Sequence, residues 1–175
     1  MPTVVDFRIS TFHHNKVDTN GKYIGRRSYP KLYAIENLFR VIIHSVLSAQ
    51  VHANWWEVVV DKGIRSKAER FQQNYVKKAS HSKPGRHGIY YIDLKDLNEI
   101  LRVNAAFFDP IIPDLNKWIL GIEEIRLPRN IVAHMNFPHQ TDMKRIDVFY
   151  HDCLNLVAGL QARIELEIPW QMKLV

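Results

Sequence analysis

The feature that most constrains this 175-residue chain is a long run of apolar residues at helical spacing in its first third. The run begins after Tyr29-Pro30 and recurs every three or four residues over about five turns, which places its members on one helix face. Its members are Leu32, Ile35, Leu38, Phe39, Ile42, Ile43, Val46 and Leu47. A stripe this long needs partner helices to cover it, so it predicts a helical core.

Further amphipathic segments follow along the chain. The expected helices cover 66–79, a segment that begins at Asp93, a segment from Asp114 to near Pro128, and a last helix that begins at Thr141-Asp142. Asp93 and Asp114 stand where an N-cap carboxylate accepts backbone N–H groups of the first turn. Residues 80–88 contain Pro84-Gly85 and are expected to form a loop. The expected fold is an all-α helical bundle of about four to five main helices.

The first thirty residues differ from the rest. Val5, Phe7 and Ile9 alternate with polar residues, which is typical of a short strand. Asn20-Gly21 lies between Val17 and Tyr23-Ile24 and resembles a hairpin turn. We therefore expect residues 1–30 to form a short β-like extension and residues 31–175 to form one helical domain.

The cysteine content and the hydropathy pattern restrict the setting in which this chain works. Cys153 is the single cysteine and cannot form an internal disulfide, and no cluster of Cys and His with zinc-ligand spacing occurs. The N-terminal residues lack the apolar run of a secretory signal, and no stretch of about 18 apolar residues is evident. His13-His14 resembles half of a metal site but has no neighbouring carboxylates, so a solvated loop is expected. These patterns predict a cytoplasmic protein without membrane association, metal or cofactor.

Positive charge is concentrated in one segment. Residues 62–88 have a formal charge of +7, with Glu69 as their one acidic residue, whereas the whole chain has +6. The basic residues are Lys62, Arg65, Lys67, Arg70, Lys77, Lys78, Lys83 and Arg86. Such a segment, interleaved with Tyr75, His81 and His87, fits the phosphates and unpaired bases of RNA. A solvated helix face that continues into a loop explains the same charge, so both interpretations stay open.

A short segment before the last helix combines an arginine, a carboxamide and an imidazole. Arg129, Asn130 and His134 lie within two turns of Pro128, a residue that suits the first turn of a helix but not its interior. On a regular helix Asn130 and His134 share a face, whereas Arg129 and His134 diverge by roughly 140°. Either the helix is irregular near Pro128, or a second copy of the chain completes the site across a two-fold axis. We favour the second alternative.

These three side chains suit the cleavage of an RNA phosphodiester by its own 2′-hydroxyl. An imidazole can take the 2′-OH proton or donate a proton to the departing 5′-oxygen. A guanidinium can hold the non-bridging oxygens and stabilise their developing charge. The carboxamide of Asn130 can fix the imidazole tautomer or contact the phosphate. This reaction requires no metal ion.

At these residues the chain resembles the HEPN superfamily, whose signature is Arg, a polar residue, and His after four to six intervening positions. Arg129, Asn130 and His134 match that signature, with four residues between the first and the last. The segments 34–40, 54–56 and 90–97 resemble the branch of HEPN domains first described in a nuclear transcript-surveillance endonuclease. The likeness extends over about residues 29–152.

The resemblance implies an all-α fold and a homodimer that brings two Arg/His motifs together. It implies a metal-independent endoribonuclease that acts on RNA and leaves a 2′,3′-cyclic phosphate and a 5′-hydroxyl. Many members act in toxin–antitoxin, phage-defence or RNA-processing systems, which implies a cognate antitoxin or regulatory protein as a partner. Other members are inactive and bind a nucleic acid, a nucleotide or a protein. One toxin branch carries a tyrosine two positions after the histidine, where this chain has Asn136.

Several residues have a structural interpretation beside the functional one. Arg129 and His134 can satisfy helix ends and interhelical hydrogen bonds. Glu36 and Arg40 stand four residues apart, where they either support Arg129 or form an ordinary surface pair. Trp55-Trp56 can stack on bases, although core packing is expected for at least one of them.

Overall fold

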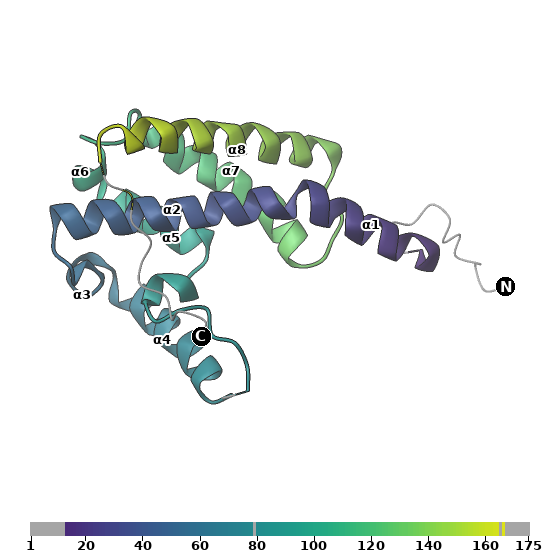
Figure 1. Cartoon of the computed structure of the whole chain (residues 1–175), viewed down its shortest axis with the longest axis horizontal. Helices are drawn as coiled ribbons and strands as arrows, with labels where there is room; N and C mark the ends of the chain where they lie inside the picture. The colour runs from purple at the N-terminus through teal and green to yellow at the C-terminus, as the bar shows by residue number, and fades with distance from the viewer. Residues whose placement is uncertain (1–12, 79, 165, 167–175) are drawn as a thin grey trace.

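The computed structural model describes residues 13–78, 80–164 and 166, and within these residues it is all-α (Figure 1). Its elements, in chain order, are α1 (His14–Arg27), α2 (Tyr29–Gln50), α3 (Trp55–Val59), α4 (Lys62–Val76), the 3₁₀ turn η1 (Gly88–Tyr91), α5 (Leu94–Val103), α6 (Ala105–Phe108), α7 (Leu115–Ala133) and α8 (Gln140–Gln161). The prediction of an all-α helical bundle is confirmed.

Helix α2 is the centre of the bundle. Its apolar stripe is buried as expected, and Ile35, Ile43 and Leu47 have no exposed surface. Helices α8, α5 and α6 pack against it, and α7 packs against both α5 and α8. In Figure 1, α2 and α8 lie side by side across the molecule, while α4 projects to one side and contacts η1. The apolar stripe of α2 thus forms a central part of the hydrophobic core.

The hairpin predicted around Asn20-Gly21 is wrong, because these residues lie inside α1. Helix α1 prolongs the line of α2 (Figure 1), where Ile24 packs against the core. The ring of Tyr23 stacks on Phe137, in the loop after α7, with ring centroids 6.0 Å apart. These tertiary contacts outweigh the local turn preference of Asn-Gly and the helix penalty of glycine, which is about 1 kcal/mol. The strand expected near Val5 lies outside the described residues, and the domain boundary near residue 30 stays a prediction.

Two helix starts follow from their caps. Helix α4 begins at Lys62, four residues before the expected start, because the Asp61 carboxylate accepts the N–H of Gly63 at 2.7 Å. Helix α5 begins after Asp93, as predicted, and the Asp93 carboxylate accepts the N–H of Asp96 at 3.2 Å. The expected side-chain cap by Asp114 is wrong, since its backbone is left-handed (φ 51°) and its side chain makes no capping bond.

Helix α7 does not end near Pro128 but continues through it to Ala133. A proline in a helix interior removes one backbone hydrogen bond and costs about 3 kcal/mol. Pro128 is buried, and Ile125 and Val132 on either side of it belong to the core, so burial offsets the cost. The irregular helix considered for this segment is therefore absent, and residues 129–133 continue the same helix.

By length and composition alone, the helical stretch His14–Gln50 is apolar enough to cross a membrane. The stretch joins α1 to α2, and the apolar stripe of α2 is buried inside the bundle. A core helix passes the same test, so the pattern is explained by packing between helices.

A cluster of rings attaches η1 to α2 and α3. The imidazole of His87 stacks on Trp55 with centroids 5.2 Å apart and meets the edges of Trp56 and His44 at 5.3 and 5.5 Å. Its Nδ1 atom accepts the N–H of Ile89 at 3.1 Å and so caps η1. Burial and the neighbouring His44 lower the pKa of His87 to about 4. The cluster therefore requires a neutral imidazole at this position.

We predict that stability falls as the pH drops from about 6.5 to about 4 because of His87. The pKa of His87 in the folded chain lies below its ordinary value of 6.5, so the unfolded chain binds a proton in this pH range while the folded chain does not. The free energy of unfolding falls by at most about 3 kcal/mol, and screening by water around the partly exposed ring makes the loss smaller. Urea unfolding at a series of pH values measures it.

The matched control for this prediction is His87→Asn, which keeps a capping acceptor but does not titrate. Its stability should be lower than that of the wild type at pH 7, since the ring contacts are lost, but it should change less between pH 6.5 and 4. If the free energy of unfolding fell equally with pH in the wild type and in His87→Asn, His87 would not be the cause of the decline.

Candidate functional site

The centre of the candidate site is an ion pair between Arg129 on α7 and Glu36 on α2. Both Nε and Nη2 of Arg129 donate to Oε2 of Glu36, at 3.1 and 3.0 Å. The side chain of Glu36 is 15% exposed and that of Arg129 is 25% exposed, so the pair is largely shielded from water. An ion pair in this setting fixes the guanidinium far more firmly than a surface pair does.

Arg40 extends this ion pair to a third element. Its Nη2 donates to the other oxygen of Glu36 at 2.6 Å and to the backbone oxygen of Ile92 at 2.9 Å. Its Nε donates to the backbone oxygen of Ile89, in η1, at 3.1 Å. Of the two residues expected to support Arg129, Glu36 contacts it directly, and Arg40 is connected to it through Glu36. We call Glu36, Arg40 and Arg129 the arginine cluster.

Asn130 orients the guanidinium of Arg129, and no described contact joins its amide to an imidazole. Its Oδ1 accepts a hydrogen bond from Nη1 of Arg129 at 3.2 Å. Together with the two bonds to Glu36, this occupies three of the five N–H groups of a guanidinium. One N–H on Nη1 and one on Nη2 have no partner among the described residues, and we call these two groups the open edge of Arg129. A guanidinium donates such groups to phosphate oxygens.

His134 is the first residue after α7 and is exposed. Helix α7 ends in a Schellman motif, in which the N–H of Asn136 donates to Ile131 and that of Met135 donates to Val132. Met135 takes the left-handed position of this motif, with φ 59°, where glycine is usual. The strained Met135 thus follows directly after the histidine of the motif. Strained backbone of this kind is frequent at functional sites.

Arg129 and His134 do not converge within one copy of the chain. Because α7 is continuous to Ala133, the two side chains leave the helix in directions that differ by roughly 140°. Arg129 points to Glu36 on α2, whereas His134 lies at the exposed end of α7. A site that uses both groups on one atom requires a second chain.

A pocket of about 350 Å³ opens beside the arginine cluster, between α2, the end of α7 and the loop before η1. Its lining residues are Tyr29, Leu32, Tyr33, Glu36, Asn37, Arg40, Pro84, Tyr90, Arg129, Val132 and Ala133. Sequence analysis missed its tyrosines. Tyr29 and Tyr33 stand four residues apart beside the apolar stripe of α2, and this spacing was the available signal.

The basic segment 62–88 is divided between two roles. Lys67 bonds to Asp96 at 2.6 Å and to Asp93 at 2.9 Å. Burial opposes the charge on Lys67, but these bonds outweigh it, so the pKa of Lys67 is raised. Arg65 pairs with Glu57 and donates to the backbone of Val60. Both cations are therefore paired within the chain, and their expected contact with RNA stays a prediction.

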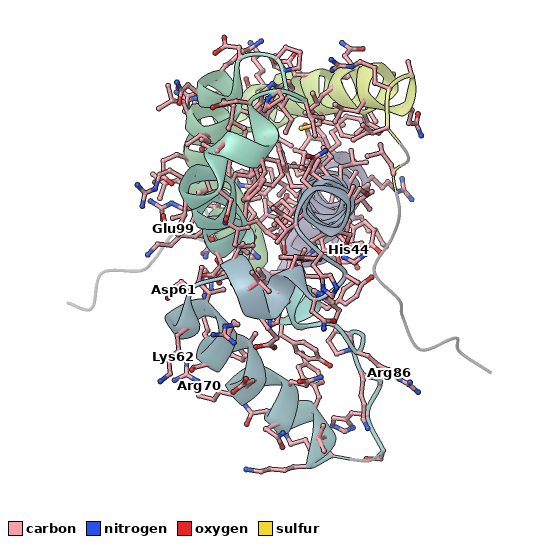
Figure 2. The ribbon with its side chains drawn as sticks, turned by 90° about the vertical axis from the view of Figure 1, so that its left-hand side faces the viewer. His44, Asp61, Lys62, Arg70, Arg86 and Glu99 are labelled. Atoms are coloured by element: carbon pink, nitrogen blue, oxygen red, sulfur yellow. The ribbon has the colours of Figure 1, made fainter. Side chains whose placement is uncertain are left out.

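The other six basic side chains of this segment are exposed. They are Lys62, Arg70, Lys77, Lys78, Lys83 and Arg86. In Figure 2, Lys62 and Arg70 lie on one side of the molecule and Arg86 on the other, so the charge does not form one continuous face. Pro84, which lines the pocket, stands between Lys83 and Arg86 in the chain. The loop of the segment therefore contributes to the wall of the pocket beside the arginine cluster.

The remaining candidates have structural explanations. Trp55 is fully buried and Trp56 nearly so, which confirms core packing for both. Cys153 is buried, and burial raises the pKa of its thiol to about 12, which disfavours the thiolate. Nδ1 of His13 caps α1 by accepting the N–H of Asn15. Among the described residues, no group of His, Cys, Asp and Glu is arranged to hold a metal ion.

We predict that Glu36→Gln lowers stability by about 3 kcal/mol, because it leaves two neighbouring guanidinium groups without their shared carboxylate. Chemical denaturation at pH 7 measures the loss. The matched control is Glu123→Gln, which breaks a surface pair with Arg126 in which Glu123 is 51% exposed. We expect less than about 1 kcal/mol there. Equal losses in the two variants would contradict a central role for Glu36.

We predict that Met135→Gly stabilises the chain by about 1 kcal/mol, because glycine adopts the left-handed conformation without strain. The side chain of Met135 is 84% exposed, so its removal sacrifices little packing. Thermal unfolding should show a higher midpoint for Met135→Gly than for wild type. Met135→Ala keeps the strained backbone and should lie close to wild type, and an equal rise in both variants would contradict the explanation by strain.

Comparisons with protein-family models, curated proteins and solved structures give no match for this chain. We therefore infer its function from the site itself. That site consists of a guanidinium held by a shielded carboxylate with one edge open, a tyrosine-lined pocket beside it, and an exposed imidazole at the end of the same helix.

Proposed function

We propose that this chain is a metal-independent endoribonuclease that acts as a homodimer. The observation that carries the proposal is the fixed guanidinium of Arg129, whose open edge lies beside a pocket while Glu36 and Asn130 hold its other edges. A guanidinium held in advance stabilises a developing phosphorane charge without reorganisation. The resemblance to HEPN domains supports the same assignment.

In the proposed reaction, His134 of one copy takes the proton of the ribose 2′-hydroxyl. The 2′-oxygen forms a bond to phosphorus, and the bond from phosphorus to the 5′-oxygen breaks. His134 of the other copy, which starts protonated, gives its proton to that 5′-oxygen. Arg129 holds the two non-bridging oxygens throughout. The products are a 2′,3′-cyclic phosphate and a 5′-hydroxyl, and proton exchange with water restores both imidazoles.

A homodimer supplies what one copy lacks. Each copy has one His134, whereas the reaction uses one base and one acid, and the continuous α7 turns Arg129 away from the His134 of its own chain. Across a two-fold axis, the exposed end of α7 in one copy meets the same end in the other. One central cleft then contains two guanidinium groups and two imidazoles.

The surroundings of the cleft favour a flexible anionic substrate. The exposed cations of the loop before η1 can contact the phosphates of RNA that enters the pocket, and α4 carries further exposed cations. We place the activity in the cytoplasm, since the single cysteine is unpaired and buried. As a toxin or phage-defence effector, such a nuclease would need a cognate antitoxin or regulatory protein to restrain it.

A second candidate is a catalytically inactive HEPN module that binds a nucleic acid, a nucleotide or a protein. The pairing of Glu36 with both Arg129 and Arg40 favours it, because this carboxylate neutralises part of the charge that a phosphate would meet. In this case the arginine cluster acts mainly as a structural bond between α2, α7 and η1.

We predict that the wild-type chain cleaves RNA in excess EDTA and that Arg129→Ala and His134→Ala each reduce the rate at least about a hundredfold. The loss follows from the removal of the phosphate-binding group and of the proton-transfer group. Cleavage of labelled single-stranded RNA is followed by gel electrophoresis, and the cyclic phosphate is identified by mass spectrometry. Arg126→Ala, which removes a surface arginine of the same helix, should leave the rate unchanged.

Three results would oppose the proposal. Loss of cleavage on chelation would contradict a metal-free reaction, and full activity in both variants would remove the site. Binding of RNA without cleavage by the wild type would favour the inactive module. Analytical ultracentrifugation tests the dimer separately, and a monomer that cleaves RNA would contradict the composite site.

A further inference from the structure

Two exposed tyrosines on α2 line the pocket beside the arginine cluster. Tyr29 is 59% exposed and Tyr33 is 62% exposed, although both are large aromatic side chains next to the most buried helix of the bundle. Their ring centroids are 6.4 Å apart and their planes differ by 31°. Neither ring belongs to the core, so packing within this chain does not explain them.

The polar groups of this pocket are bonded mainly to each other. Asn37 donates to the backbone oxygen of Tyr33 at 2.8 Å and accepts from Arg40 at 3.2 Å. Both oxygens of Glu36 are occupied by guanidinium groups. A ligand therefore meets tyrosine rings and the open edge of Arg129, rather than unused amide or carboxylate groups. Such a wall suits a flat, uncharged ring attached to an anion.

We infer that this pocket holds one base of single-stranded RNA, stacked on Tyr33 with Tyr29 beside it, while the adjoining phosphate contacts Arg129. The inference rests on the proposed function and adds a base-binding subsite to it. Stacking uses the π-face that every base has, so the subsite accepts different bases. The bonded polar groups cannot read base edges, and the binding should show weak sequence preference.

The position of the pocket favours a strand over a free nucleotide. The pocket is open between α2, α7 and the loop before η1, and its charged lining residues, Glu36, Arg40 and Arg129, sum to one positive charge. One such charge matches one phosphodiester, whereas a nucleoside triphosphate needs several cations or a metal ion. The exposed Lys83 lies next to Pro84 of the lining and can contact a neighbouring phosphate of a continuing strand.

The test uses the full chain and a short single-stranded RNA in which every 2′-hydroxyl is methylated, so that it cannot be cleaved. One position carries 2-aminopurine, whose fluorescence falls when the base stacks. Wild type and Tyr33→Phe should bind with similar affinity and quench the probe. Tyr33→Ala should lose most of the quenching and bind about tenfold more weakly, as expected for one base stacked on one ring.

The control is Leu120→Ala, which removes an exposed apolar side chain of α7 that lines a different cavity. It should bind and quench as wild type does, and circular dichroism checks the fold of each variant. Equal affinity and quenching in Tyr33→Ala and wild type would overturn the inference. If Tyr33→Phe behaved like Tyr33→Ala, a contact with the tyrosine hydroxyl rather than stacking would explain the binding. If 2-aminopurine riboside monophosphate bound as tightly as the RNA, the ligand of the pocket would be a free nucleotide rather than a strand.

Cleavage of unmodified RNA distinguishes the two proposals. If wild type quenches the probe but does not cleave RNA, the base subsite stands and the nuclease fails. If wild type cleaves RNA and Tyr33→Ala binds and quenches as well as wild type, the nuclease stands and the subsite fails.

Discussion

The carboxylate of Glu36 is the contact on which the site depends. It lies between two guanidinium groups, one on its own helix and one on α7, and Arg40 carries the connection onward to the carbonyls of Ile89 and Ile92. Three segments far apart in the sequence therefore meet at one partly buried charge. Arg40 and Arg129 share the carboxylate of Glu36. A movement of α7 against α2 would separate Arg129 from this carboxylate in a place that water does not reach easily, which is energetically costly.

The helices could be predicted from the sequence because their evidence is periodic and long. The stripe from Leu32 to Leu47 specifies α2, and the carboxylate of Asp93 specifies the start of α5. Predictions that depended on one or two residues had mixed outcomes, since the Asp93 cap is confirmed but the hairpin at Asn20-Gly21 and the helix end near Pro128 are wrong. Asn20-Gly21 lies within α1, and Pro128 lies within α7, because burial and ring packing at those places exceed the local preference of the residues.

In the candidate site, contacts between residues of one helix could be predicted from their spacing in the sequence. Contacts between residues of different elements could not. Glu36 and Arg40 were recognisable as an i,i+4 pair on the polar side of α2. By contrast, the pairing of Lys67 with Asp93 and Asp96 joins two helices, so counting charges along the chain overestimated the free cations of α4. The tyrosine pocket combines residues from α2, α7 and the loop before η1, and such a combination has no local signature.

The course of α7 explains where Arg129 and His134 lie relative to each other. If α7 had stopped at Pro128, Arg129 to His134 would have formed a loop able to gather its own side chains. Burial of Pro128 instead extends the helix, which assigns Arg129 to the interior contact with α2 and leaves His134 at an exposed end. The left-handed Met135 then turns the chain away at once. One helix thus holds the guanidinium of Arg129 rigidly against α2 and leaves the imidazole of His134 exposed, which is the arrangement that the proposed two-chain site requires.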